Sequence, residues 1–180
     1  MGIIMFDIET TGINPYRSQV TLIGFKKEGK IKQLKLWEFT DEAEMILEAI
    51  NEFKKFRSND TIIGYNNIKF DIPFLLQRLE ILGEMKPEYW SIFYERKWLD
   101  LYQFMGDNYR TLDLWLEKFG IKKAHPELTG RQMPEYFRKK EYEKIEAHNR
   151  DNLNTSEELY LKLKAEFPDL LESKFHGKNF

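Results

Sequence analysis

Two carboxylates near the N-terminus have a spacing that could support chemistry. Asp7 and Glu9 lie two residues apart, where the apolar run over residues 3–7 ends. Because side chains two apart on a strand project from the same face, both carboxylates would point together. Buried without partners they would be costly, so they need a cation, hydrogen-bond donors or water. Carboxylate oxygens suit Mg²⁺ or Mn²⁺, whereas the simpler alternative is a solvated strand end with two surface acids.

A second polar segment follows the apolar run Thr61–Gly64, which is typical of a buried strand. Asp71 opens the next predicted helix, and the simplest interpretation is that it is the N-cap of that helix. Tyr65 and Phe70 could be packing residues, or they could stack on the terminal bases of a single strand. Asn66 could donate a hydrogen bond to a phosphate or to a neighbouring carboxylate.

A third polar group lies in the C-terminal part of the chain, which is predicted to be helical. On a helix, His148 shares a face with Asp151 and Asn152, three and four residues further on. A histidine suits general-base work because its ordinary pKa is ~6.5, although a lone surface histidine without a role is the simpler interpretation. We assign no role to His125 or His176.

Hydrophobic periodicity predicts the elements that must position these groups. Strands are expected over residues 3–7, 19–27, 30–39, 61–64 and 98–99. Helices are expected over residues 41–56, 71–83, 101–105, 111–119, 135–150 and 156–167, with a loop over 122–134. This order predicts an α/β fold, a mixed sheet flanked by helices.

Composition limits the class of protein. The 180 residues, 42% hydrophobic and 32% charged, predict one globular domain over 1–180. A net charge of −2 excludes a uniformly basic nucleic-acid-binding protein, so phosphate contacts would have to come from local clusters. The absence of cysteine excludes disulfides and thiolate zinc sites. We expect a cytoplasmic protein, because the N-terminus does not look like a signal peptide and no stretch approaches membrane-spanning length.

Together, the first two segments resemble the DEDD (DnaQ-like) 3′→5′ exonuclease superfamily. Residues 6–12 (FDIETTG) are similar to its first motif. Residues 64–75 (GYNNIKFDIPFL) are similar to its second, especially as found in the proofreading exonuclease domains of family B DNA polymerases. Residues 98–101 and 112–121 also resemble connecting segments of that group, so the resemblance covers nearly the whole chain.

The resemblance implies an RNase H-like fold and a 3′→5′ exonuclease that releases nucleoside monophosphates from single-stranded ends, with DNA favoured over RNA. It implies four carboxylates that hold two divalent ions, Mg²⁺ or Mn²⁺, with Asp7, Glu9 and Asp71 in three of the four places. Such ions activate the attacking water and stabilise the leaving oxygen. Five residues are assigned to substrate holding: Thr10, Thr11, Tyr65, Asn66 and Phe70.

The third family motif has Tyr-x-x-x-Asp or His-x-x-x-x-Asp, and this chain has neither. If His148 takes the Tyr place, the aspartate place falls on Asn152, which is neutral. If Asp151 is the family aspartate, the Tyr place falls on Ala147. We interpret His148 as the group that orients the water, with Asp151 or position 152 completing the metal site. Asn152 could also be an engineered replacement of a natural aspartate. Alternative functions are an exoribonuclease and a nucleic-acid-binding domain with impaired catalysis.

Overall fold

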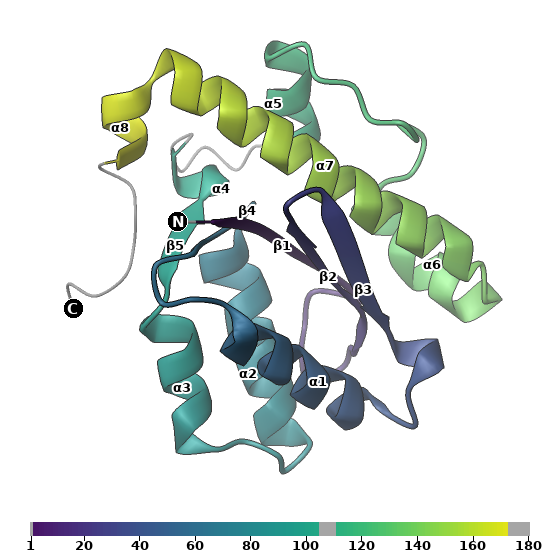
Figure 1. The fold of residues 1–180 in the computed structure, drawn as a ribbon. Helices are drawn as coiled ribbons and strands as arrows, with labels where there is room; N and C mark the ends of the chain where they lie inside the picture. The colour runs from purple at the N-terminus through teal and green to yellow at the C-terminus, as the bar shows by residue number, and fades with distance from the viewer. Residues whose placement is uncertain (1, 105–110, 173–180) are drawn as a thin grey trace.

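The computed structural model describes residues 2–104 and 111–172, and its centre is a five-stranded sheet in the order β3-β2-β1-β4-β5 (Figure 1). The first three strands are antiparallel: β1 (Ile3–Thr10), β2 (Val20–Lys27) and β3 (Lys30–Lys35). Two further strands extend the sheet parallel to β1: β4 (Thr61–Gly64) and β5 (Lys97–Asp100). The predicted mixed sheet is confirmed, and β1 is its central strand.

Helices cover both faces of the sheet. One layer contains α1 (Glu42–Lys55), α2 (Ile72–Ile81) and α3 (Pro87–Tyr94). The other is crossed by α7 (Tyr142–Glu166), with α5 (Leu112–Lys118), α6 (Met133–Lys139) and α8 (Pro168–Glu172) around it. Short elements complete the description: η1 (Leu36–Glu38), the π-helical turn η2 (Asn67–Asp71), α4 (Leu101–Phe104) and η3 (Gly130–Gln132).

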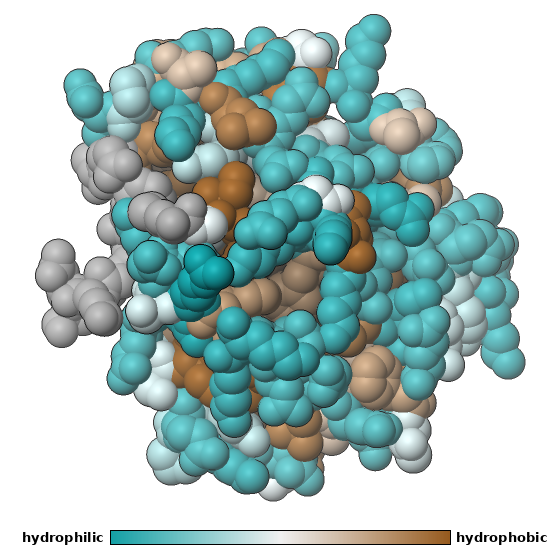
Figure 2. Space-filling view, viewed as in Figure 1, coloured by the Kyte–Doolittle hydropathy of each residue, from teal (hydrophilic) through white to brown (hydrophobic). Residues whose placement is uncertain are grey.

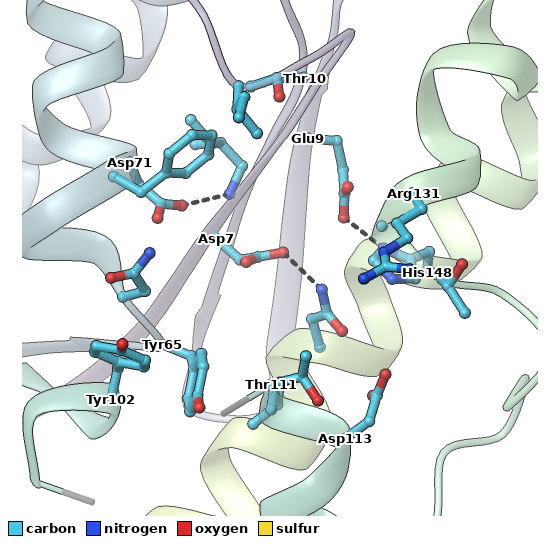
Figure 3. Close-up of a pocket in the computed structure, with 18 of the residues that line it drawn as sticks. Asp7, Glu9, Thr10, Tyr65, Asp71, Tyr102, Thr111, Asp113, Arg131 and His148 are labelled. Carbon is cyan, nitrogen blue, oxygen red and sulfur yellow. Dashed lines mark hydrogen bonds and ion pairs between the residues drawn. The ribbon is translucent and has the colours of Figure 1, made fainter. Parts of the chain in front are cut away.

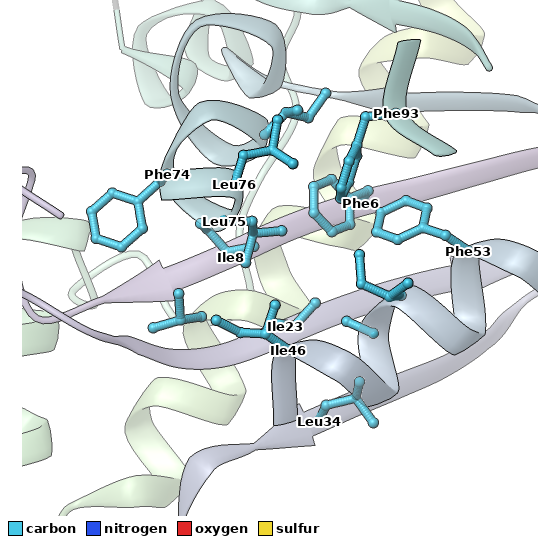
Figure 4. Packing of buried hydrophobic residues seen from close by; sticks show 14 of the residues in the cluster. Phe6, Ile8, Ile23, Leu34, Ile46, Phe53, Phe74, Leu75, Leu76 and Phe93 are labelled. Carbon is cyan, nitrogen blue, oxygen red and sulfur yellow. The ribbon is translucent and has the colours of Figure 1, made fainter. Parts of the chain in front are cut away.

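The central strand sends successive side chains to opposite layers, as a two-residue period requires. Phe6 and Ile8 enter the core formed with α1, α2 and α3 (Figure 4), where Phe6 packs edge-on against Phe53. Met5 enters the second core, beneath α7. Asp7 and Glu9 continue the Met5 row, so both carboxylates leave the strand on the side that α7 covers.

The C-terminal helices divide at a different place from the predicted one. Residues 151–155 were expected to separate two helices, but they lie inside α7, which is 25 residues long. The division lies instead at Lys140, whose φ is 61°. Asp and Asn are weak helix formers, yet α7 packs against β1 and β2, and this packing overrides the local preference. The segment from His148 to Asn152 is therefore held in the middle of a helix.

Other boundaries also differ from expectation. The strand predicted to reach residue 39 ends at Lys35 and continues as η1, and the helix α3 was not predicted at all. The predicted helix end at Met105 lies outside the described residues. In the part of the chain that the structure describes, no helix is both long and apolar enough to cross a membrane. The face shown in Figure 2 is mostly hydrophilic, with apolar side chains visible in recesses between polar ones.

One close approach fixes α7 against the sheet. Gly24 of β2 pairs with Asp7 on one side and with Gln33 on the other. A Cβ atom at position 24 would lie 2.1 Å from Oδ1 of Asn149, a separation that real Cβ contacts do not reach. Glycine at this position therefore makes room for the Asn149 side chain, which is fully buried.

Gly24→Ala is expected to lower the free energy of unfolding by about 1–3 kcal/mol, because overpacking forces α7 or the Asn149 side chain to move. Urea denaturation measures the change. In an Asn149→Ala background the clash is absent, so the same substitution should have a clearly smaller effect. Equal effects in both backgrounds would contradict this account of the contact.

Candidate active site

The carboxyl ends of β1 and β4 border a pocket of about 1070 Å³. Asp7, Glu9 and Asp71 line it, and Figure 3 shows their carboxylates around one opening. Asp7 and Glu9 come from β1, whereas Asp71 is the last residue of the turn η2. The fold thus brings the first two predicted segments together.

Asp7 is held by two amide side chains from α7. Asn149 Nδ2 donates to Asp7 Oδ2 at 2.9 Å, and Asn152 Nδ2 lies 3.3 Å from the same oxygen. Gln33 Nε2 donates to Asn149 Oδ1 at 3.0 Å, which turns the Asn149 amide nitrogen toward Asp7. The chain Gln33–Asn149–Asp7 therefore crosses the sheet above Gly24.

Glu9 is paired with His148. Their Oε1 and Nδ1 atoms lie 2.8 Å apart, and both residues are about 5% exposed. Burial lowers the pKa of His148, but the charge and the hydrogen bond of Glu9 raise it more, so the net shift is upward. Glu9 thus fixes the orientation of the imidazole ring and favours its protonated form.

Asp71 does not cap the helix that it precedes. Its side chain makes no cap hydrogen bond, and Oδ1 accepts the backbone N–H of Ile8 at 3.1 Å. The preceding turn is irregular: Asn66 has a φ of 65° and η2 is π-helical. Such conformations are uncommon and often occur at functional sites. They direct the carboxylate of Asp71 back toward β1.

Asp100, at the end of β5, stabilises this irregular turn. Its carboxylate accepts the backbone N–H groups of Asn66 at 2.7 Å, Ile68 at 3.1 Å and Tyr102 at 3.0 Å. The side chain is 1% exposed, and this burial raises its pKa although the backbone donors oppose the shift. Asp100 therefore positions Asn66 and Asp71.

The carboxylates repel one another. Burial and the charge of Glu9 raise the pKa of Asp7 to about 7. Burial and the charge of Asp7 raise the pKa of Asp71 well above its ordinary value. Ionising the whole group in a poorly solvated place is therefore unfavourable. Among the described residues, no three His, Cys, Asp or Glu side chains converge in an arrangement that could already hold a metal ion.

Asn152, and not Asp151, is the residue that α7 turns into the pocket. Asp151 Oδ2 instead accepts the backbone N–H of His125 at 2.7 Å and lies 3.3 Å from its Nδ1. Successive residues of a helix are about 100° apart, so the two side chains face different neighbours. Asp151 was expected among the metal ligands, but it does not line the pocket. Its partner is His125, to which no role was assigned from the sequence.

Most of the predicted substrate-holding residues line the pocket: Thr10, Tyr65, Asn66 and Phe70. Thr11 does not, because its Oγ1 accepts the backbone N–H of Gln19 and closes the loop after β1. Lys69, Lys123 and Arg131 add positive charge to the lining. Lys123 is nearly buried and pairs with Asp113 at 2.6 Å.

Sequence reasoning missed Asn149 and Asp100. Asn149 follows His148 in the sequence, but nothing local shows that its amide reaches Asp7. The amide does so because Gly24 of β2 leaves room for the Asn149 side chain. Asp100 closes the short apolar strand Lys97–Asp100, and an acid that ends a buried strand is the signal that could have identified it.

The family model of the RNase H superfamily matches residues 4–164. The chain belongs to this superfamily. The predicted RNase H-like fold is therefore confirmed. No curated protein matches the chain.

Solved structures with this superfamily fold include exonuclease I. A product-bound exonuclease I has a TM-score of 0.66 at 14% identity, over 96% of this chain and 45% of that one. Exonuclease I from Methylocaldum szegediense has a TM-score of 0.64 at 15% identity, over 96% of this chain and 42% of that one. E. coli exonuclease I in complex with a dA16 oligonucleotide has a TM-score of 0.65 at 12% identity, over 96% and 42%.

The chain thus spans less than half the length of these exonucleases. Their fold agrees with the resemblance to DEDD exonucleases. The closer comparison with polymerase proofreading domains stays a prediction.

Asp7→Asn is expected to stabilise the metal-free protein at pH 8. The folded-state pKa of Asp7, about 7, lies above its ordinary value of 3.8. Its contribution to stability is therefore fully present below about pH 4 and is lost as the pH rises through 7. The variant should gain about 1–2 kcal/mol at pH 8, and the gain should shrink as the pH falls from 7 to 4.

Urea denaturation in the presence of a chelator, over this pH range, measures the difference. Glu158→Gln, an acid-to-amide change at an exposed position of α7, is the control and should alter stability by less than ~0.5 kcal/mol. A variant that is less stable than the natural sequence at pH 8 would show that the fold tolerates ionised Asp7 without strain.

Proposed function

We propose that this protein is a metal-dependent 3′→5′ exonuclease. It hydrolyses terminal phosphodiester bonds of single-stranded nucleic acid, DNA in preference to RNA, and releases nucleoside monophosphates. The observation that carries the proposal is that Asp7, Glu9 and Asp71 all line one pocket of an RNase H superfamily fold.

Two features of the pocket fit a divalent cation. Glu9 raises the proton affinity of Asp7, and Asp7 raises that of Asp71, so a cation would relieve a repulsion that the fold builds in. Asn152 Oδ1 is buried beside Asp7 and has no hydrogen-bond partner among the described residues. Asp7, Glu9 and Asp71 are the residues that would hold the cation, and their oxygens are the donors that Mg²⁺ and Mn²⁺ prefer. When bound, such a cation lowers the pKa of water and polarises a phosphoryl oxygen.

The remaining lining suits the end of a single strand. Tyr65 and Tyr102 form an edge-to-face pair, with ring centroids 5.6 Å apart, at the side of the pocket opposite Glu9 (Figure 3). Aromatic rings of this kind hold bases by stacking, whatever their sequence. Phe70 adds a further apolar surface. Lys69 and Arg131 can contact backbone phosphates. Such local cations would be needed because the net charge of the chain is −2.

His148 is the candidate for proton handling. Glu9 holds the ring through Nδ1, which leaves Nε2 to exchange a proton with the attacking water or with the departing oxygen. Asn149 and Asn152 keep Asp7 in place by donating to its Oδ2. The preference for DNA is supported by the dA16 complex of E. coli exonuclease I, the oligonucleotide being that protein's ligand.

The purified protein should shorten a 5′-labelled single-stranded DNA in Mg²⁺ or Mn²⁺ to a ladder of labelled products. Shortening from the 3′ end gives such a ladder, whereas attack from the 5′ end releases the label at once. Gel electrophoresis separates the two outcomes. A matched RNA strand should be degraded more slowly, and the reverse ranking would favour the exoribonuclease.

Asp7→Ala removes a proposed metal ligand and should reduce this activity more than ~100-fold. Substitution of residues that only hydrogen-bond to metal ligands typically costs ~10–100-fold. Glu158→Gln, far from the pocket in α7, should retain it. Equal activity of Asp7→Ala and the natural sequence would mean that the degradation comes from elsewhere, and the proposed site would be abandoned.

A second candidate function is nucleic-acid binding with impaired catalysis, which is favoured by the neutral Asn152 beside Asp7. It predicts that the labelled strand is bound but stays intact, even in Mn²⁺. Electrophoretic mobility of the strand, measured beside the degradation assay, distinguishes this function from the first.

A further inference from the structure

Asn152 gives the pocket a neutral side chain where it faces Asp7. Its Nδ2 donates toward Asp7 Oδ2 at 3.3 Å, and its Oδ1 is buried without a partner in the described part of the chain. A carboxylate here would add a negative charge directly beside Asp7. The amide adds none.

The neighbouring carboxylates that could supply this charge are committed elsewhere. Asp151 is bound to His125, and Asp113 is paired with the nearly buried Lys123 at 2.6 Å. Asp100 accepts the backbone N–H groups of Asn66 and Ile68 in the turn that it stabilises, and that of Tyr102 in α4. None of these carboxylates can turn toward Asp7 without giving up the hydrogen bonds or the ion pair that hold it.

Of the four carboxylates that line the opening, Asp113 is neutralised by its ion pair with Lys123, which leaves Asp7, Glu9 and Asp71 to face a cation. Glu9 also shares one oxygen with His148 at 2.8 Å. Two divalent cations carry four positive charges between them, and Arg131 already adds positive charge to the lining. A second cation would be bound against an excess of positive charge, in a place where burial weakens screening by water.

We propose that the pocket binds a single divalent cation per chain, held by the carboxylates of Asp7, Glu9 and Asp71, and that Asn152 removes the place for a second. This proposal rests on the proposed function, because it specifies the metal content of the same site. It departs from the two ions that the family resemblance implies.

The test counts Mn²⁺ on the metal-free protein without nucleic acid, by calorimetric titration and by the electron paramagnetic resonance signal of unbound Mn²⁺. The natural sequence should bind one Mn²⁺ per chain. Asn152→Asp should bind two, with the second at least ~10-fold tighter than any second ion on the natural sequence. Asp151→Asn should still bind one.

Three results would overturn the proposal: two tightly bound Mn²⁺ on the natural sequence, a single Mn²⁺ on folded Asn152→Asp, or loss of binding in folded Asp151→Asn. Circular dichroism verifies that each variant is folded. If Asn152→Asp fails to fold, anomalous diffraction from crystals of the natural sequence soaked in Mn²⁺ counts the ions directly.

The Mn²⁺ count and the nuclease assay test the two proposals separately. A chain that binds one Mn²⁺ but leaves every strand intact would overturn the proposed function and support the single-ion site. A chain that binds two and degrades DNA would do the reverse. A chain that binds none would overturn both.

Discussion

Three carboxylates crowded at the end of the central strand repel one another, and much of the surrounding structure opposes that repulsion. Each carboxylate has its own partner: the amides of α7 donate to Asp7, His148 of the same helix pairs with Glu9, and the Ile8 backbone donates to Asp71. Every carboxylate thus requires a partner held close to it. This requirement explains why a long helix crosses the sheet so closely that only glycine fits at position 24.

The same requirement accounts for the irregular chain after β4. A regular helix beginning there would turn the Asp71 side chain toward its own N-terminus as a cap. A π-helical turn preceded by Asn66 in the left-handed region directs it to Ile8 instead. Such backbone is stable only when its surroundings hold it. Asp100 does so through hydrogen bonds to Asn66 and Ile68, and it adds a buried carboxylate near an already repulsive group.

Local patterns predicted the acids but not their supports. Spacing of two on a strand was enough to place Asp7 and Glu9 on one face, and the mixed sheet followed from the order of elements. The contact of Asn149 with Gly24 joins residues distant in sequence, so no periodicity reveals it. The break predicted after Arg150 was wrong because weak helix formers there are outweighed by packing on the sheet. The true break at Lys140 has neither Gly nor Pro to mark it.

The length of chain between β1 and α7 has a consequence for how the protein forms. The contacts that complete the site join residues whose sequence separation is 139 to 145 positions, and these contacts are among the most non-local in the fold. The hairpins β1–β2 and β2–β3 need only short loops and can form early, whereas α7 can dock only after nearly the whole chain is available. Folding intermediates that lack α7 would expose Asp7 and Glu9 to water as ordinary acids. The chemistry of the pocket is thus one of the last properties that the folding chain acquires.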